Sequence, residues 1–136
     1  MKKKLNCILL VDDNAADNRY HKIIIKAMNI TEHIEIALDG EEAINFLKKE
    51  SQTPPEIIFL DINMPKMNGW EFLDVYQELK AEQRANVMIV MLTTSSNPDD
   101  EKKAKQISEV TSFKTKPLTE EMLTELLEKH FPDNIK

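Results

Sequence analysis

Three continuous apolar segments limit what this chain can fold into more than any other feature of its sequence. None of them alternates between apolar and polar residues, and they span Cys7–Val11, Ile57–Leu60 and Val87–Leu92. Short runs rich in valine, isoleucine and leucine are typical of parallel strands that are buried on both faces of a sheet. The sequence therefore predicts a parallel sheet with these segments at its centre.

Two weaker segments complete the predicted sheet. His33–Leu38 alternates between apolar and polar residues. It places Ile34, Ile36 and Leu38 on one side, as expected of an edge strand that is buried on one face only. Val110–Phe113 is shorter and predicts another strand near the end of the chain.

Helical periodicity fills the intervals between these segments. Apolar residues recur there at steps of three and four, which predicts one buried stripe on each helix. In chain order the stripes contain Ala16, Tyr20, Ile23, Ile24, Ala27 and Met28; Ala43, Ile44 and Leu47; Phe72, Leu73, Tyr76 and Leu79; and Leu118, Met122, Leu123, Leu126 and Leu127. A further helix is predicted to begin at Pro98, because proline is favoured at the first helical position and Asn97 can cap it.

The resulting order, a strand followed by a helix five times over, predicts a single α/β domain over residues 1–136 with no output domain. Alternation of this kind gives a parallel sheet with helices on both faces and right-handed connections. We expect a flavodoxin-like (βα)5 three-layer sandwich whose five strands lie in the order 2-1-3-4-5. Ligands of such sheets bind outside the carboxyl ends of the strands, near the point where the strand order reverses.

The chain has only two glycines, Gly40 and Gly69, and both fall in predicted loops beside the second and third strands. Glycine reaches positive φ without a steric cost. We therefore predict that each glycine serves a turn with positive φ.

Charge and the length of the apolar runs narrow the classes of function. The net charge of −6 disfavours binding to nucleic acid or to an anionic membrane. No apolar segment approaches the ~20 residues of a membrane helix, and the run after the N-terminal lysines is too short for a signal peptide. Cys7 has no partner for a disulfide, and the three histidines lack metal-site spacing, so we interpret them as ordinary surface or core residues. These features favour a cytoplasmic protein.

Polar residues follow the predicted strands at the edge where ligands are expected. They are Asp12 and Asp13 after the first strand, Asp61 after the third, Thr93 after the fourth and Lys116 after the fifth. Carboxylates at one edge repel one another, at about 1–4 kcal/mol for each close pair, unless a cation offsets them. Oxygen ligands from separate loops leave room for water and suit Mg²⁺ better than Ca²⁺, which is expected to recruit a dedicated loop. The sequence therefore predicts a magnesium site.

The same residues indicate a chemistry. A carboxylate beside a divalent cation, an ammonium and a hydroxyl is suited to attack on a phosphoryl group, because the cation and the ammonium neutralise charge on the phosphoryl oxygens. Lys116 provides the ammonium and Thr93 the hydroxyl.

Five separated motifs resemble those of the receiver domain of two-component response regulators, the CheY-like family. In chain order they are Ile8–Asn14, Ala37–Ala43, Leu60–Glu71, Thr93 and Phe113–Pro117. The third motif is the most specific, since it resembles the loop that contains the phosphoacceptor aspartate of that family. The resemblance covers essentially the whole chain.

The resemblance implies a role for each matching acidic residue. Asp61 would be the phosphoacceptor. Mg²⁺ would be held by Asp12, Asp13, Asp61 and the backbone carbonyl of Asn63.

The resemblance also implies roles for residues of the fourth and fifth strands. Thr93 would hydrogen-bond to the phosphoryl group, and Lys116 would pair with it. Phe113 matches an aromatic residue that changes rotamer together with Thr93 when the protein is switched. Pro117 matches a proline whose preceding peptide bond is typically cis in this family.

A protein of this family takes its phosphoryl group from a histidine kinase or a histidine phosphotransfer protein that docks near the first helix. It signals through a protein that binds the phosphorylated form, or through onward phosphotransfer. The resemblance thus implies a signalling protein rather than an enzyme, with intrinsic self-phosphorylation and dephosphorylation at the same site.

Three other interpretations stay open from the residues alone. A degenerate receiver would bind partners without being phosphorylated. A phosphatase of the haloacid dehalogenase type would also form an aspartyl phosphate, but that class needs a second aspartate two residues later, where this chain has Asn63. A flavodoxin-like flavin site would bring the acidic segment Asp12–Asn14 against a phosphate, which that segment repels.

Overall fold

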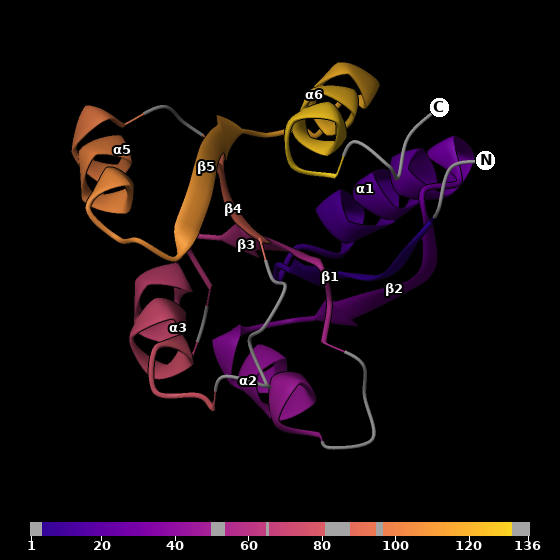
Figure 1. Cartoon of the computed structure of the whole chain (residues 1–136). Helices are drawn as coiled ribbons and strands as arrows, with labels where there is room; N and C mark the ends of the chain where they lie inside the picture. The colour runs from indigo at the N-terminus through magenta and orange to yellow at the C-terminus, as the bar shows by residue number, and fades with distance from the viewer. Residues whose placement is uncertain (1–3, 50–53, 65, 81–87, 95–96, 132–136) are drawn as a thin grey trace.

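The structure is a computed structural model that describes residues 4–49, 54–64, 66–80, 88–94 and 97–131 (Figure 1). Val87 of the predicted fourth strand and Pro65 of the third motif lie outside these described residues. Within them, five parallel strands form one sheet in the order β2-β1-β3-β4-β5. The predicted flavodoxin-like fold class and strand order are therefore confirmed.

The strands agree closely with the apolar segments of the sequence. Their bounds are β1 Leu5–Val11, β2 Thr31–Ala37, β3 Ile57–Asp61, β4 Met88–Thr93 and β5 Val110–Thr115. The central strands β3 and β4 are buried throughout, whereas the edge strands β2 and β5 are partly exposed. The register places Val11 opposite both Ala37 and Leu60, so β1, β2 and β3 end at the same edge of the sheet.

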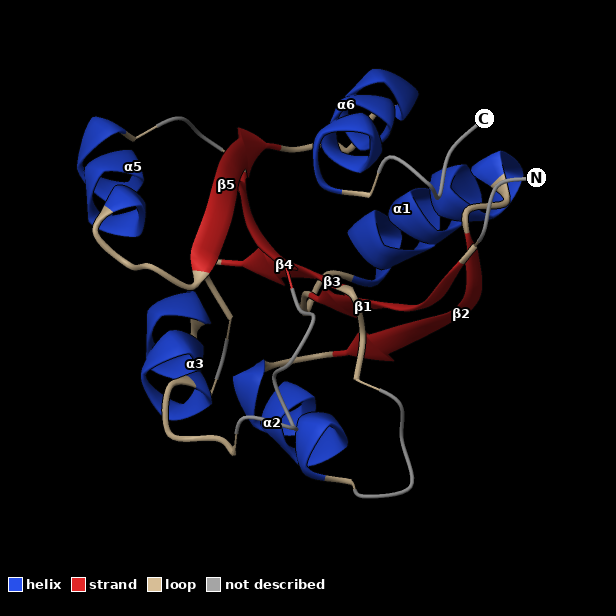
Figure 2. Cartoon of the chain, in the orientation of Figure 1, coloured by secondary structure: helices blue, strands red, loops and turns tan. Residues whose placement is uncertain are grey.

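Five helices in the described part of the chain cover the sheet (Figure 2). Their bounds are α1 Ala15–Met28, α2 Gly40–Lys48, α3 Gly69–Tyr76, α5 Pro98–Lys105 and α6 Glu120–His130. Each helix follows a side chain that accepts a hydrogen bond from a backbone N–H of the first turn, and these caps are Asn14, Asp39, Asn68, Asn97 and Thr119. Helices α2, α3 and α5 lie on one face and α1 and α6 on the other, which gives three layers.

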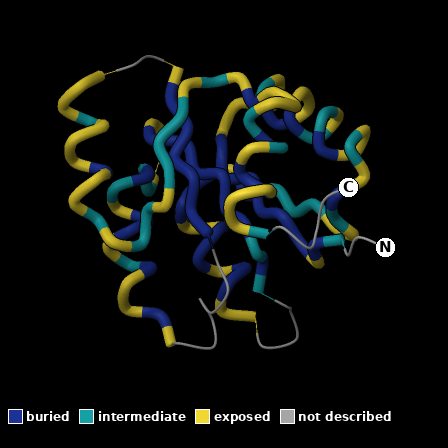
Figure 3. Tube along the Cα trace, turned by 45° about the horizontal axis from the view of Figure 1, so that its top comes forward, coloured by how far each residue is buried: buried dark blue, intermediate teal, exposed yellow. Residues whose placement is uncertain are grey.

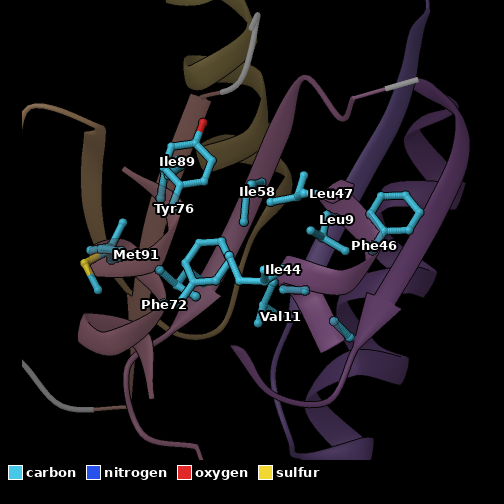
Figure 4. Close-up of a cluster of buried hydrophobic side chains, with 14 of the residues drawn as sticks. Leu9, Val11, Ile44, Phe46, Leu47, Ile58, Phe72, Tyr76, Ile89 and Met91 are labelled. Atoms are coloured by element: carbon cyan, nitrogen blue, oxygen red, sulfur yellow. The ribbon is translucent and has the colours of Figure 1, made fainter. Parts of the chain in front are cut away.

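The core consists of one apolar cluster on each face of the sheet. The first cluster joins β1, β3 and β4 to α2 and α3, with Leu9 and Phe72 among its members (Figure 4). The second joins the same strands to α1 and α6, with Phe59 and Leu123 among its members. Figure 3 shows the buried strands in the middle of the molecule and the exposed outer sides of the helices. Among the described residues, no helix combines the length and the apolar character needed to cross a bilayer.

The apolar stripe predicted for α1 is only partly confirmed: Ile24 and Met28 pack against the second core cluster, whereas other members of the stripe are exposed. Tyr20 and Ile23 are 48% and 59% exposed, whereas the buried residues of this helix are Asn18, His21 and Ile25. Asn18 and His21 can face inward because each forms a hydrogen bond with the backbone of a neighbouring loop. A pattern of apolar residues alone does not reveal such a polar inner face.

Leu38 also departs from its predicted place in the edge strand. β2 ends at Ala37, and Leu38 is 47% exposed in the turn before α2. Its backbone N–H donates to the carboxylate of Glu42 at 2.9 Å, and the next residue, Asp39, caps the helix. The turn into α2 therefore removes Leu38 from the alternating pattern.

Neither glycine has the predicted positive φ. Among the described residues, positive φ occurs at Asn29 and Lys66, with values of 56° and 63°. Gly40 and Gly69 are instead the first residues of α2 and α3, where a Cβ on Gly69 would lie 2.7 Å from the carbonyl oxygen of Asp61. A Cβ on Gly40 would meet the loop after β3 just as closely. Both positions need glycine for close backbone approach and not for a turn.

Glu56 joins three strands at the amino edge of the sheet. Its carboxylate accepts hydrogen bonds from the backbone N–H groups of Asn6 and Cys7 in β1, at 3.1 Å each. Its own backbone N–H donates to the carbonyl of Cys7, and its carbonyl accepts from the N–H of Met88 at the start of β4. A single residue that precedes β3 therefore links β1 and β4 at this edge through hydrogen bonds.

Candidate functional site

Three aspartates meet at the carboxyl edge of the sheet. Asp12 and Asp13 directly follow β1, and Asp61 is the last residue of β3. Each offers one carboxylate oxygen within 4.8 Å of those of the other two, close enough to bind one metal ion together. Asp12 and Asp61 are buried, whereas Asp13 is exposed. The cluster therefore has two buried carboxylates and a third that solvent reaches.

Asp12 is held in place by four hydrogen bonds, one of which its backbone N–H donates to the carbonyl of Ala37 at 3.0 Å. Its Oδ1 accepts from the backbone N–H of Asn14 at 2.9 Å, and its backbone carbonyl accepts from the side-chain amide of Asn18 at 2.9 Å. Its Oδ2 accepts from Nζ of Lys116 at 2.6 Å. Because Asn14 also caps α1, the turn that orients the carboxylate is the turn that starts the helix.

The ammonium of Lys116 lies among three carboxylates. Its Nζ is 2.6 Å from Asp12, 2.9 Å from Asp17 and 3.3 Å from Asp61. The lysine side chain is only 8% exposed, so water screens these interactions weakly. The backbone N–H of Lys116 donates to the carbonyl of Thr93 at 2.7 Å, which extends the pairing of β4 and β5 beyond the end of β5.

The charges in this cluster affect Asp61 and Lys116 in different ways. Burial, together with the neighbouring carboxylate of Asp12, raises the pKa of Asp61 to about 6, although Lys116 acts in the opposite direction. Burial by itself would lower the pKa of Lys116, but hydrogen bonds to Asp12 and Asp17 outweigh it and raise that pKa above its ordinary value. Asp61 is thus a carboxylate whose ionised form would be favoured by a further cation nearby.

The loop between β3 and α3 is shaped by its own hydrogen bonds. The backbone N–H of Gly69 donates to the carbonyl of Ile62 at 2.8 Å, which brings the two ends of the loop together. Asn68 and Glu71 exchange hydrogen bonds in a capping box at the start of α3. Asn63 is exposed in this loop, two residues after Asp61.

Thr93 and Phe113 lie on the adjacent strands β4 and β5. Thr93 is buried at the end of β4 and is opposite Thr115. Phe113 is half-buried and packs against the first core cluster. The peptide bond between Lys116 and Pro117 is cis, as the family resemblance implied. The structure thus brings Thr93 and Lys116 to the edge that holds the aspartates.

Three polar residues on α1 that the sequence patterns did not predict as part of the site contact this edge. Asp17, Asn18 and His21 form hydrogen bonds with, respectively, the side chain of Lys116, the carbonyl of Asp12 and the N–H of Leu118. They are spaced so that they lie on one side of the helix. Polar residues at helical spacing after an acidic strand end were the signal that could have revealed them.

The donor set fits a hard divalent cation. Carboxylate oxygens are the ligands that Mg²⁺ and Mn²⁺ prefer, and here they come from two strand ends and leave one side accessible to water and substrate. Asp12, Asp17 and Asp61 all approach one ammonium, so negative charge remains that a divalent cation would offset. An edge of this composition can bind a phosphoryl group and present a carboxylate to it.

Comparison with known proteins agrees with this geometry. Residues 8–128 match the family model of the response regulator receiver domain. The chain is 37% identical over 97 residues to Response regulator Rcp1 of Synechocystis sp., a match that covers 68% of this chain and 65% of that protein.

Solved structures give the same result. A two-component response regulator from Cytophaga hutchinsonii superposes with a TM-score of 0.85 at 31% identity, covering 96% of this chain and 99% of the other. The Mn(2+)-bound form of response regulator Rcp1 superposes with a TM-score of 0.73 at 30% identity, covering 96% and 97%.

Proposed function

This chain belongs to the response regulator receiver domain family, and on that premise we propose that Asp61 accepts a phosphoryl group in a Mg²⁺-dependent reaction. The observation that supports the proposal is the meeting of Asp12, Asp13, Asp61 and Lys116 at one edge of the sheet. Membership of this family also sets aside the phosphatase and flavin-protein alternatives.

The transfer itself follows from the position of Asp61. A carboxylate oxygen of Asp61 attacks the phosphorus of a phosphohistidine on the donor protein. The new O–P bond forms as the N–P bond breaks, and the imidazole of the donor leaves. The ammonium of Lys116, 3.3 Å from Asp61, is close enough to pair with the phosphoryl oxygens, and the hydroxyl of Thr93 would donate to them.

A divalent cation would be held by Asp12, Asp13, Asp61 and the backbone carbonyl of Asn63. When bound, Mg²⁺ neutralises negative charge on the transferring phosphoryl group. Two observations support this part of the proposal: three carboxylates lie within 4.8 Å of one another, and the similar Rcp1 has been solved in a Mn(2+)-bound form. A cation at this position would also favour the ionised form of Asp61, whose pKa is raised to about 6 by burial first and by Asp12 second.

Phosphorylation would be read out as a change in the surface formed by α5, β5 and α6. Thr93 would move toward the phosphoryl group, and Phe113, half-buried beside the core, would turn into the space that Thr93 leaves. A partner that binds only the phosphorylated form then shifts the equilibrium. Moving a two-state population from 1:99 to 99:1 takes about 5.5 kcal/mol of preferential binding.

The phosphoryl donor is a histidine kinase or a histidine phosphotransfer protein, and we place its docking surface on α1. Tyr20 and Ile23 expose apolar side chains on this helix, which also contributes Asp17 to the site. Output from residues 1–136 would pass to a partner protein or by onward phosphotransfer. We expect such a protein to act in the cytoplasm, without contact with nucleic acid and without insertion into a membrane.

The proposal is tested by incubating the protein with acetyl phosphate and Mg²⁺ and measuring its intact mass. We expect one added phosphoryl group on the wild-type chain, no addition to Asp61→Asn, and an unchanged addition to Asp74→Asn, whose carboxylate is exposed on α3. EDTA should abolish the addition. A mass gain that survives in Asp61→Asn, or no gain in the wild-type chain, contradicts the proposal.

A receiver that only binds partners is the second candidate, and the fluorescence of Trp70 separates it from the first. Trp70 is the only tryptophan of the chain and lies at the start of α3, directly after the loop that follows Asp61. The ammonium of Lys103 on α5 lies 4.5 Å from the centre of its ring. We expect Mg²⁺ to quench Trp70 in the wild-type chain and not in Asp13→Asn. Absence of quenching, together with absence of phosphorylation, would favour the binding-only role.

A further inference from the structure

His21 is a buried polar side chain on the face of the sheet that α1 and α6 cover. It lies on α1 and is 2% exposed. Its Nε2 accepts a hydrogen bond from the backbone N–H of Leu118 at 3.2 Å, and Leu118 itself is fully buried. The contact joins α1 to the segment between β5 and α6, which are far apart in the chain.

The choice of histidine at this position needs a reason beyond packing. A buried polar ring costs free energy unless its nitrogen atoms are hydrogen-bonded, and an apolar side chain of similar size would pack on this face without that cost. Burial lowers the pKa of His21, so the ring is neutral at pH 7 and Nε2 can accept while Nδ1 carries the proton. The hydrogen bond to Leu118 is therefore the specific feature that histidine provides.

The segment held by His21 is the one that contains Lys116. The backbone N–H of Lys116 donates to the carbonyl of Thr93 at 2.7 Å, and two residues later the N–H of Leu118 donates to His21. The short segment from Lys116 to Leu118 is thus fixed from β4 on one side and from α1 on the other. The side chain of Lys116 extends from this segment and places Nζ 3.3 Å from Asp61.

We propose that His21 is a positioning residue for phosphoryl acceptance: its hydrogen bond to Leu118 fixes the backbone from which Lys116 reaches Asp61. The inference rests on the proposed function of Asp61 and adds a residue to it. Rates of transfer respond steeply to such placement, since a displacement of about 1 Å can cost about a hundredfold. His21 touches neither the phosphoryl group nor the metal ligands through any hydrogen bond of the described residues, so its effect acts through Lys116.

The test compares variants that keep or remove the acceptor at Nε2. His21→Gln retains an acceptor at a similar reach, whereas His21→Leu fills the space without one and the more adaptable His21→Met offers only a weakly accepting sulfur. His33→Leu, at an exposed position of β2, is the matched control. For each folded variant, the rate of phosphorylation by acetyl phosphate and the hydrogen exchange of the Leu118 amide are measured at pH 7.5.

We expect the apolar variants to be phosphorylated about tenfold more slowly than the wild-type chain, and their Leu118 amide to exchange faster. His21→Gln and the control should stay close to the wild-type rate. In a Lys116→Ala background, His21→Leu should cause no further decrease, because the residue it positions is absent. A purely structural role would lower stability without this dependence on Lys116.

Three results would overturn the inference. The first is a wild-type rate in a folded apolar variant, the second is a decrease in His21→Gln equal to that in His21→Leu, and the third is an undiminished effect of His21→Leu in the Lys116→Ala background. If His21→Leu does not fold, His21→Met supplies the comparison. A wild-type chain that takes no phosphoryl group overturns the proposed function and this inference together, whereas a phosphorylated wild type with unaffected variants overturns only the inference.

Discussion

Asp61 keeps a raised pKa although the ammonium of Lys116 lies 3.3 Å from its carboxylate. Burial and the nearby Asp12 carboxylate together outweigh the attraction of the lysine, which is shared with Asp12 and Asp17. The residue that would perform the chemistry is therefore ionised at neutral pH at a cost in stability.

Asp61→Asn should stabilise the metal-free protein at pH 7.5. A pKa raised on folding from 3.8 to about 6 means that the folded chain binds the proton more tightly than the unfolded chain does. The associated stability is present below pH 3.8 and is lost as the pH rises through about 6, so it is absent at pH 7.5. Removing the charge should recover about 1–3 kcal/mol, at about 1.4 kcal/mol for each pKa unit. Urea unfolding in EDTA measures this gain.

The same variant should lose the stabilisation that Mg²⁺ gives to the wild-type chain, because one ligand is missing. Asp74→Asn, exposed on α3, provides the control and should change neither quantity. An Asp61→Asn protein that is less stable than the wild type in EDTA would contradict this account of the site.

Gly69→Ala should destabilise the fold by about 1–3 kcal/mol, because its Cβ would meet backbone atoms that cannot move independently. The carbonyl oxygen of Asp61 would lie 2.7 Å away and Cα of Ile62 3.0 Å away. The displacement of Asp61 should also slow phosphorylation. Asn45→Ala, exposed within α2, is the control and should change stability by less than about 0.5 kcal/mol. Equal stability of the two variants would show that the close approach is unimportant.

Ile23→Asp should separate phosphorylation by a protein from phosphorylation by a small molecule. Ile23 is exposed on α1 beside Tyr20, so a charge there would disturb an apolar contact with the donor protein without reaching Asp61. The donor is the histidine kinase or phosphotransfer protein that phosphorylates the wild-type chain fastest. We expect the rate of transfer from this donor to fall about tenfold or more, while the rate with acetyl phosphate stays the same. Leu38→Asp, at another exposed apolar residue, is the control and should leave both rates unchanged. Equal transfer to both variants would remove α1 from the docking surface.

Acid should destabilise the wild-type chain more than His21→Gln. The folded pKa of His21 is lowered by burial first; Lys116 also lowers it, while Asp17 and Asp12 act in the opposite direction. A lowered pKa means that stability from the neutral ring is present above pH 6.5 and is lost as the pH falls through the folded value. The difference in unfolding free energy between the two proteins should therefore narrow below pH 6.5, by at most about 1.4 kcal/mol per pH unit. Asp61 is present in both proteins, so its contribution to the pH dependence cancels in the comparison. A difference in unfolding free energy that does not change with pH would show that His21 is not buried as a neutral ring.

The sequence predicted the fold because its central strands need no tertiary information to be seen. Ile57–Asp61 and Met88–Thr93 are buried along their whole length, so their apolar runs alone identify them. The strand order then places Asp12 and Asp61 at one edge of the sheet. The acidic cluster was predictable from the order of the strands more than from the structural preferences of single residues.

What the sequence did not predict depends on contacts between distant segments. Asn18 and His21 face inward because their partners are the backbone atoms of Asp12 and Leu118, and no periodicity of α1 encodes those partners. Gly69 is required by the carbonyl of Asp61, which likewise becomes a neighbour only after folding. Polar inner faces and close backbone approaches follow from the tertiary structure, and an apolar pattern cannot report them.

Glu56 lies at the opposite end of the strands from Asp61, and its carboxylate and backbone tie β1, β3 and β4 together there. The hydrogen bonds that join the amino ends of these three strands are therefore separated from the acidic cluster by the length of the sheet, and a change at Glu56 would reach the site only through the strands themselves.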